Sequence, residues 1–175
     1  MKAFLIDLAG SRRYWIGLAL LGIALEAGAL YFQYARDELP CVLCIHVRIW
    51  VLAFVLIALL AAFLGRSRSA SRLFHGLTTL AMLALAERSW QVLAVERGWT
   101  FGDCELDLGM PAWFALDKWL PAVFEVQTSC GYSPLIAFGI TVAESLLVVS
   151  VILAIVSASL LVASWLDGRP KNPHH

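Results

Sequence analysis

Charged side chains are scarce in this sequence. Of its 175 residues, only 15% are Asp, Glu, Lys or Arg, whereas 61% are hydrophobic, and the mean hydropathy is +0.79. A soluble domain is typically about half apolar and about a quarter charged. The 13 basic and 13 acidic residues also cancel, so the composition offers no basic surface for nucleic acid. It predicts an integral membrane protein embedded in a lipid bilayer, with no nucleic-acid partner.

Signatures of common cofactors are missing as well. The sequence has no glycine fingerprint of a dinucleotide-binding fold and no flavin signature. Its Cys-x-x-Cys pair, Cys41 and Cys44, is followed by Ile45 and not by the histidine of a haem-attachment motif. A cleavable signal peptide is not expected either, because the first apolar run is long and lacks a small-residue cleavage site.

Four apolar runs are long enough to cross the hydrocarbon core of a bilayer, which takes about 20 helical residues. They cover residues 14–34, 42–64, 73–95 and 142–164. The third run is interrupted by Glu87 and Arg88 in its second half, and the fourth apolar stretch starts already near Leu135. The sequence therefore predicts an all-α bundle of four transmembrane helices, forming a single integral membrane domain over residues 1–175.

Basic residues gather on one predicted side of the membrane. Residues 1–13, 65–72 and 167–171 are rich in Lys and Arg, whereas residues 96–134 contain six acidic and only two basic side chains. Cytoplasmic segments carry the excess of Lys and Arg in membrane proteins. We therefore predict that both termini are cytoplasmic and that the loops 35–41 and 96–134 lie on the outer side.

The longer outer loop contains a segment that mixes tryptophans with charges. Within residues 110–124, Trp113, Leu116, Leu120 and Val123 recur at roughly helical spacing. Such a pattern is typical of a short amphipathic helix lying on a membrane surface. We expect this helix on the outer surface, with a break at Pro121.

All four cysteines fall on the predicted outer side. Cys41 and Cys44 are neighbours on one face of a helix that starts near Cys41, and Arg48 lies one turn beyond Cys44. A helix N-terminus and a positive charge both favour the thiolate, which is the reactive form of a cysteine. Cys104 and Cys130 lie in a loop long enough to move. The two pairs suggest a relay of thiol–disulfide exchange.

Electrons that reach Cys44 need an acceptor, and a membrane quinone is the expected one. The cation of Arg48 could stabilise both the thiolate and the negative charge that develops on the acceptor. Other interpretations remain open: four cysteines could form a structural zinc site or two static disulfides, and Arg48 could extend to the membrane interface. Glu26, inside the first span, is either a functional carboxyl group or a protonated one bonded to a neighbouring helix.

Several stretches give this sequence a specific likeness. They are Ala24-Leu25-Glu26 followed by Tyr31-Phe32-Gln33, Pro40-Cys41-Val42-Leu43-Cys44-Ile45 with Arg48, and Leu116-Asp117-Lys118-Trp119-Leu120-Pro121-Ala122-Val123-Phe124. In these features the chain resembles the DsbB family, the quinone-linked disulfide oxidoreductases of the bacterial inner membrane. The likeness covers almost the whole chain.

The resemblance implies a role for each cysteine. Cys104 and Cys130 would form the disulfide that oxidises DsbA, a periplasmic thiol oxidase, with Cys104 making the mixed disulfide. Cys130 would exchange with Cys41, and Cys44 would meet ubiquinone or menaquinone beside Arg48. All four cysteines would then be periplasmic. An alternative within the family is a member dedicated to a specialised DsbA-like partner.

The chain also departs from the family's pattern. Val47 stands where members often carry a glutamate just before the arginine. Members often have a histidine in the outer part of the third span, where this chain has Arg88, Ser89 and Trp90. The sequence assigns no role to Glu26, Glu87 or Glu144.

Overall fold

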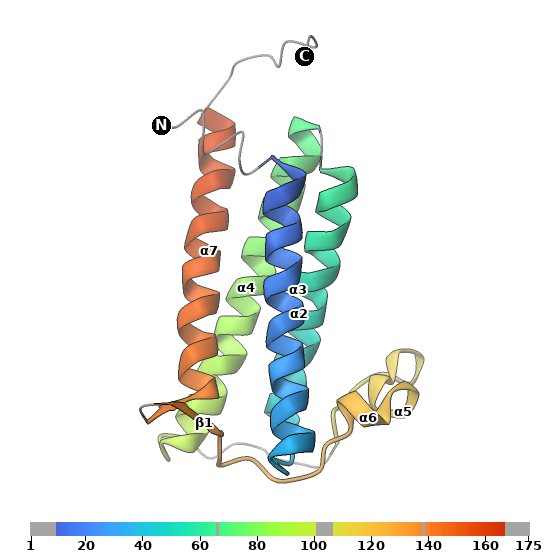
Figure 1. Cartoon of the computed structure of the whole chain (residues 1–175), viewed down its shortest axis with the longest axis vertical. Helices are drawn as coiled ribbons and strands as arrows, with labels where there is room; N and C mark the ends of the chain where they lie inside the picture. Colours follow the sequence, from blue (N-terminus) through green and yellow to red (C-terminus); the bar gives the residue numbers. More distant parts are fainter. Residues whose placement is uncertain (1–9, 66, 101–106, 138, 167–175) are drawn as a thin grey trace.

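Four long helices dominate the computed structural model, which describes residues 10–65, 67–100, 107–137 and 139–166. They are α2 (Arg12–Ala35), α3 (Val42–Leu64), α4 (Arg68–Glu96) and α7 (Val142–Leu166), and they run side by side (Figure 1). Of these, α2, α3 and α7 are long and apolar enough to cross a membrane. This confirms the prediction of a mostly helical membrane protein. The fourth helix, α4, carries more charge and falls outside that group, so its passage through the bilayer stays a prediction.

Side-chain caps define where the helices begin. Ser11 accepts a hydrogen bond from the backbone N–H of Tyr14 at the start of α2, and the Cys41 sulfur accepts one from Cys44 at the start of α3. Ser67 caps α4 in the same way. These bonds satisfy backbone donors that have no partner within the first turn of a helix.

The helices pack in the order α2, α3, α4 and α7. Neighbours in this order form packed pairs, whereas α2 and α7 do not pack closely against each other within the described residues. The interior contains large apolar side chains that are almost fully buried, among them Trp15, Phe54, Met82 and Leu85. This arrangement leaves a space between α2 and α7, which side chains of α3 and α4 also line.

One end of the bundle holds the start of α3 and is called here the cysteine end. Helices α2 and α4 end there, and α7 begins there after a short antiparallel hairpin of β1 (Leu135–Ala137) and β2 (Ile140–Thr141) (Figure 1). Thr141 and Glu144 cap each other's backbone N–H groups at the start of α7. The helix therefore begins at Val142, seven residues after the apolar stretch starts at Leu135.

The segment predicted to form an amphipathic helix with a break at Pro121 is divided into three short turns. They are η1 (Ala112–Phe114), α5 (Leu116–Trp119) and α6 (Pro121–Phe124), which lie to one side of the long helices at the cysteine end (Figure 1). The last break falls at Leu120, because the residue before a proline disfavours helical backbone. Of the predicted stripe, Leu116 is buried and Val123 is half-buried, whereas Trp113 and Leu120 are exposed. Contact with a membrane surface stays a prediction.

Close contact between α2 and α3 depends on one glycine. A Cβ atom placed on Gly22 would lie 2.5 Å from Val55 Cγ2 and 3.1 Å from Phe54 Cδ1, whereas one placed on Gly17 would meet nothing within 4 Å. Both glycines belong to the same helix. The same substitution at Gly22 and at Gly17 therefore separates the effect of packing from the effect of helix propensity.

We predict that Gly22→Leu destabilises the bundle and Gly17→Leu does not. Overpacking typically costs about 1–3 kcal/mol, whereas replacing a helical glycine on an open face gains up to about 1 kcal/mol. Thermal unfolding in detergent should show a lower midpoint for Gly22→Leu only. Equal midpoints for the two variants would contradict the packing of α2 on α3.

Candidate functional site

Cys41 and Cys44 lie at the first turn of α3. Cys41 is the capping residue with extended backbone, and its sulfur accepts a hydrogen bond from the Cys44 N–H at 3.4 Å. The two Sγ atoms lie 2.7 Å apart. The start of the helix therefore holds one sulfur against the other, and only a small side-chain adjustment separates the pair from disulfide geometry.

Cys41 is the more enclosed of the two residues. Only 3% of its surface is exposed. The hydrogen bond with the Cys44 side chain and the loss of water on burial both raise the pKa of the Cys41 thiol above its usual range. Cys41 therefore keeps its proton at neutral pH. Of the two cysteines, it is Cys44 that lines the neighbouring cavity.

A third cysteine approaches from the long loop. The backbone N–H groups of Gln127 and Thr128 donate to the Pro40 carbonyl at 2.9 and 3.3 Å, and Thr128 pairs with Cys41 in a parallel β-bridge. The side chain of Cys130, two residues further on, interacts with the Cys41 thiol through a hydrogen bond. The structure thus brings Cys41, Cys44 and Cys130 together. Cys104, the fourth cysteine of the predicted relay, lies outside the described residues.

Arg48 lies one turn beyond Cys44 and is 6% exposed. Its Nη1 donates to Gln33 Oε1 at 2.6 Å and to the Val123 carbonyl at 2.8 Å, and its Nη2 donates to the Ala29 carbonyl at 3.2 Å. A buried cation requires such partners, because it has lost its water. Arg48 does not extend to solvent. It joins α3 to α2 and to α6.

Two further side chains of α2 reach the loop beside Arg48. Gln33, itself buried, donates from Nε2 to Gln127 Oε1 at 3.4 Å. Tyr34 donates from its hydroxyl to the Ala122 carbonyl at 2.6 Å. Together with Arg48, these contacts hold the stretch from Ala122 to Gln127 against the end of α2, and this stretch leads directly to Cys130.

A cleft opens beside Cys44 and Arg48 in the space between α2 and α7. It consists of two adjoining cavities of about 90 and 160 Å³, and both are lined by Phe32, Val47 and Arg48. Cys44 lines the cavity nearer the cysteine end, and Glu26 lines the deeper one. Most other lining side chains are apolar. We call the two cavities together the Cys44 cleft.

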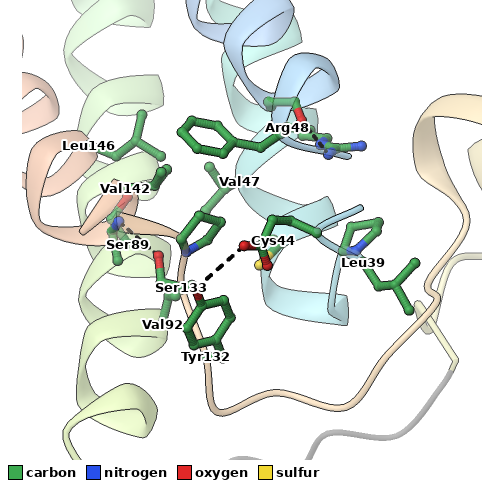
Figure 2. A pocket seen from close by; sticks show the side chains of 16 residues that line it. Leu39, Cys44, Val47, Arg48, Ser89, Val92, Tyr132, Ser133, Val142 and Leu146 are labelled. Atoms are coloured by element: carbon green, nitrogen blue, oxygen red, sulfur yellow. Dashed lines mark hydrogen bonds between the residues drawn. The ribbon is translucent and has the colours of Figure 1, made fainter. Parts of the chain in front are cut away.

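Figure 2 shows the part of this cleft nearer the cysteine end. Cys44 and Arg48 of α3 lie on one side, and Ser89 of α4 with Val142 and Leu146 of α7 lie on the other. The mouth is bordered by Tyr132, whose hydroxyl donates to Glu38 Oε1 at 3.4 Å. The cleft is therefore enclosed by elements that are distant in sequence.

The three acidic residues without an assigned role occupy different places. Glu26 faces the deep part of the cleft. Glu87 is half exposed and contacts its neighbours Arg88 and Gln91 on α4. Glu144 forms an ion pair with Arg97 and caps the start of α7. Only Glu26 is part of the candidate site.

Some residues of the site were not singled out from the sequence. Gln33 appeared there only as part of a motif, and Ser89 only as a departure from a pattern, yet both are buried at the site. A signal for Gln33 existed: it is an amide at the end of an apolar run, seven residues after Glu26 and thus on the same helix face. The backbone carbonyls of Ala29 and Val123 carry no such signal.

Comparison with known protein families gives one match over most of the chain. Residues 11–160 match the model of the family described as disulfide bond formation protein DsbB. This match covers α2, α3 and α4, most of α7, and the loop that contains the second pair of cysteines.

Individual relatives agree with this match. The disulfide bond formation protein B 2 of Pseudomonas aeruginosa is 35% identical over 127 residues, which are 69% of this chain and 73% of the relative. A disulfide bond formation protein B of Yersinia pestis is 32% identical over 140 residues, 74% of each chain. One from Actinobacillus pleuropneumoniae is 27% identical over 98% of this chain and 97% of its own. The predicted resemblance is confirmed, and the chain belongs to the DsbB family.

Proposed function

We propose that this protein is a membrane thiol–disulfide oxidoreductase that reoxidises a DsbA-like periplasmic dithiol oxidase and passes the electrons to a membrane quinone. The observation that carries the proposal is the convergence of Cys41, Cys44 and Cys130 beside a buried arginine and an apolar cleft. Family membership supports disulfide bond formation as the general process. The partner, the acceptor and the order of steps are the proposal.

The relay begins in the long loop. A thiolate of the reduced partner attacks Cys104 of the Cys104–Cys130 disulfide, which forms a mixed disulfide and releases Cys130 as a thiolate. The partner's second thiolate then releases Cys104, and the partner leaves oxidised. Two electrons now reside on Cys104 and Cys130 as two sulfur–hydrogen bonds or thiolates, in exchange for one new disulfide on the partner.

The second exchange takes place at the start of α3. Cys130 attacks Cys41 of a Cys41–Cys44 disulfide, and Cys44 leaves as a thiolate; attack of Cys104 on Cys130 then restores the loop disulfide and frees Cys41. The hydrogen bond between Cys130 and Cys41 supports this order, because it joins the two sulfurs that must react. Because the pKa of Cys41 is raised, Cys41 stays protonated and is the poorer electron donor. This supports Cys44, which lines the cleft, as the sulfur that gives up electrons next.

The chemistry of the cleft fits a quinone. Its walls are largely apolar, as the ring and tail of such a molecule require, and it contains the cation of Arg48 and the sulfur of Cys44. A bound ubiquinone or menaquinone would supply a two-electron acceptor there. Arg48 has five N–H donors, and its three hydrogen bonds to described residues leave others for an acceptor oxygen. Arg48 would thus orient a quinone oxygen and stabilise negative charge on it.

The proposed orientation places the cysteine end in the periplasm of the bacterial inner membrane and both termini in the cytoplasm. Arg12 and Arg13 at the start of α2, and Arg68 and Arg72 near the start of α4, lie at the end of the bundle opposite Cys41. Their clustering supports a cytoplasmic location for that end. The cysteines would then meet an oxidising compartment.

Two rival functions make different predictions. A structural membrane protein with two static disulfides would show no change in thiol content during reaction with a reduced partner. A family member dedicated to a specialised partner would use the same relay but would ignore a general DsbA-like oxidase. Titration of thiols after addition of different reduced partners separates these two possibilities from the main proposal.

We expect Cys130→Ala to trap the partner. Without Cys130 the mixed disulfide on Cys104 loses the thiolate that would otherwise displace the partner by the reverse reaction, so an adduct should accumulate. It is measured on non-reducing gels after addition of an oxidised DsbA-like protein, whose disulfide the Cys104 thiolate attacks. Cys104→Ala is the matched control and should give no adduct. Adducts of equal amount in both variants, or in neither, would contradict the assigned order.

We expect Cys44→Ala to abolish quinone reduction and Arg48→Gln to lower its kcat/KM about 100-fold, since one charged group beside the reacting atoms typically contributes that much. The assay follows quinone absorbance with purified protein and a reduced DsbA-like donor. Arg88→Gln, a change at a partly exposed arginine of α4, is the control and should retain wild-type rates. Wild-type rates in Arg48→Gln would rule out its role at the acceptor.

A further inference from the structure

Glu26 is an acidic side chain in an unusual place. It belongs to α2 and lines the deep part of the Cys44 cleft together with Val51 of α3 and Ser145 and Val149 of α7. Its Oε1 atom is buried and has no hydrogen-bond partner among the residues that the structure describes. An unsatisfied buried oxygen costs about 1–3 kcal/mol, and more if it is charged. The burial of this carboxyl group lowers the stability of the protein, so stability does not explain why a glutamate is present here.

The surroundings of Glu26 are almost free of other ionisable groups. Among the residues that line the deep cavity, Arg48 is the one other side chain that can carry a charge, and α7 contributes only Ser145 as a polar group. The hydrogen bonds of Arg48 run to Gln33, Val123 and Ala29, all through neutral oxygens. Glu26 and Arg48 therefore interact through their charges across the cleft, while Oε1 of Glu26 has no hydrogen-bond partner among the described residues.

The two helices place Cys44, Arg48 and Glu26 in order along the cleft. Arg48 lies four residues beyond Cys44 in α3, about 6 Å farther from the cysteine end. Glu26 lies three residues before Ala29, whose carbonyl Arg48 contacts, and thus about 4.5 Å deeper again. A sulfur that gives electrons is at one end of the cleft, a cation is in the middle, and a carboxyl group is at the far end.

We propose that Glu26 delivers a proton to the quinone oxygen that faces the deep end of the cleft. This inference rests on the proposed function, because it names a proton-transfer residue for the same reaction. Quinone reduction consumes two electrons and two protons, and Glu26 is the one carboxyl group among the described residues lining the cleft's deep part. Its buried and unpartnered Oε1 is the atom assigned to the transfer.

The reaction balances with Glu26 as an intermediate carrier. Closure of the disulfide between the Cys41 thiol and the Cys44 thiolate releases two electrons and one proton, whereas an acceptor that becomes a quinol takes up two electrons and two protons. One of these protons comes from the Cys41 thiol, which is protonated before it reacts. The other comes from Glu26, which afterwards regains a proton that the partner's dithiol released when it was oxidised. Glu26 therefore returns to its starting form after each turnover.

The kinetic test compares Glu26→Gln, Glu26→Asp and Glu87→Gln with the wild type. Glu87 is an exposed glutamate of α4 outside the cleft and is the matched control. We expect Glu26→Gln to lower kcat about 100-fold with KM for quinone within about twofold, since a general acid typically contributes 10²–10⁴-fold. Glu26→Asp should recover part of this loss. The wild-type kcat should fall as pH rises through the pKa of Glu26, because only the protonated carboxyl group can donate. The pH profile of Glu26→Gln should lack this fall.

A second readout does not depend on turnover. We compare infrared spectra of the quinone-loaded protein in its oxidised and reduced states. The difference spectrum should contain a band from a protonated carboxyl group, because this group changes its protonation or its surroundings on reduction. The band should disappear in Glu26→Gln and persist in Glu87→Gln. Oxidation of a reduced DsbA-like protein by the preformed disulfides, in a single turnover without quinone, should be the same in all four proteins.

The outcomes separate this inference from the proposed function. Quinone reduction by Glu26→Gln at a wild-type kcat, or a higher KM with unchanged kcat, would overturn the proton-transfer role while leaving the relay intact. Persistence of the carboxyl band in Glu26→Gln would also overturn it. Absence of quinone reduction in the wild type, despite normal oxidation of the partner, would overturn both.

Discussion

The burial of one cation organises the site. The guanidinium of Arg48 has lost its water, and its hydrogen bonds must come from the protein. They come from a side chain and a carbonyl of α2 and from the carbonyl of Val123 in the long loop. To satisfy Arg48, the loop must therefore lie against the bundle. The backbone bonds to Pro40 and the position of Cys130 follow a few residues later in the same stretch.

The cleft has a different origin. Since α2 and α7 each pack on other helices and not closely on each other, the space between them is closed by the hairpin at the cysteine end and by side chains from α3 and α4. The same cation lines both parts of this space. One residue thus connects loop docking, which serves the exchange between cysteine pairs, with the apolar cleft, which serves the proposed electron acceptor.

The sequence predicted local features better than long-range ones. Cys41, Cys44 and Arg48 lie within two helical turns, so helical periodicity was enough to place them together. The contact of Cys130 with Cys41 came only from the family resemblance, because no local pattern encodes the pairing of Thr128 with Cys41. The break at Pro121 was predicted from the proline itself, because the residue before it leaves helical backbone. The partners of Arg48 are partly backbone carbonyls, which carry no sequence signal.

The most direct test of this account is whether Cys41 and Cys130 form a disulfide when they are the only cysteines left. A variant with Cys44→Ala and Cys104→Ala, treated with a mild thiol oxidant in lipid discs, should give a Cys41–Cys130 bond by mass spectrometry of linked peptides. Adding Arg48→Gln should slow its formation. Complete alkylation of both thiols, under conditions in which Cys41 and Cys44 alone form their bond, would contradict the docking of the loop on α3.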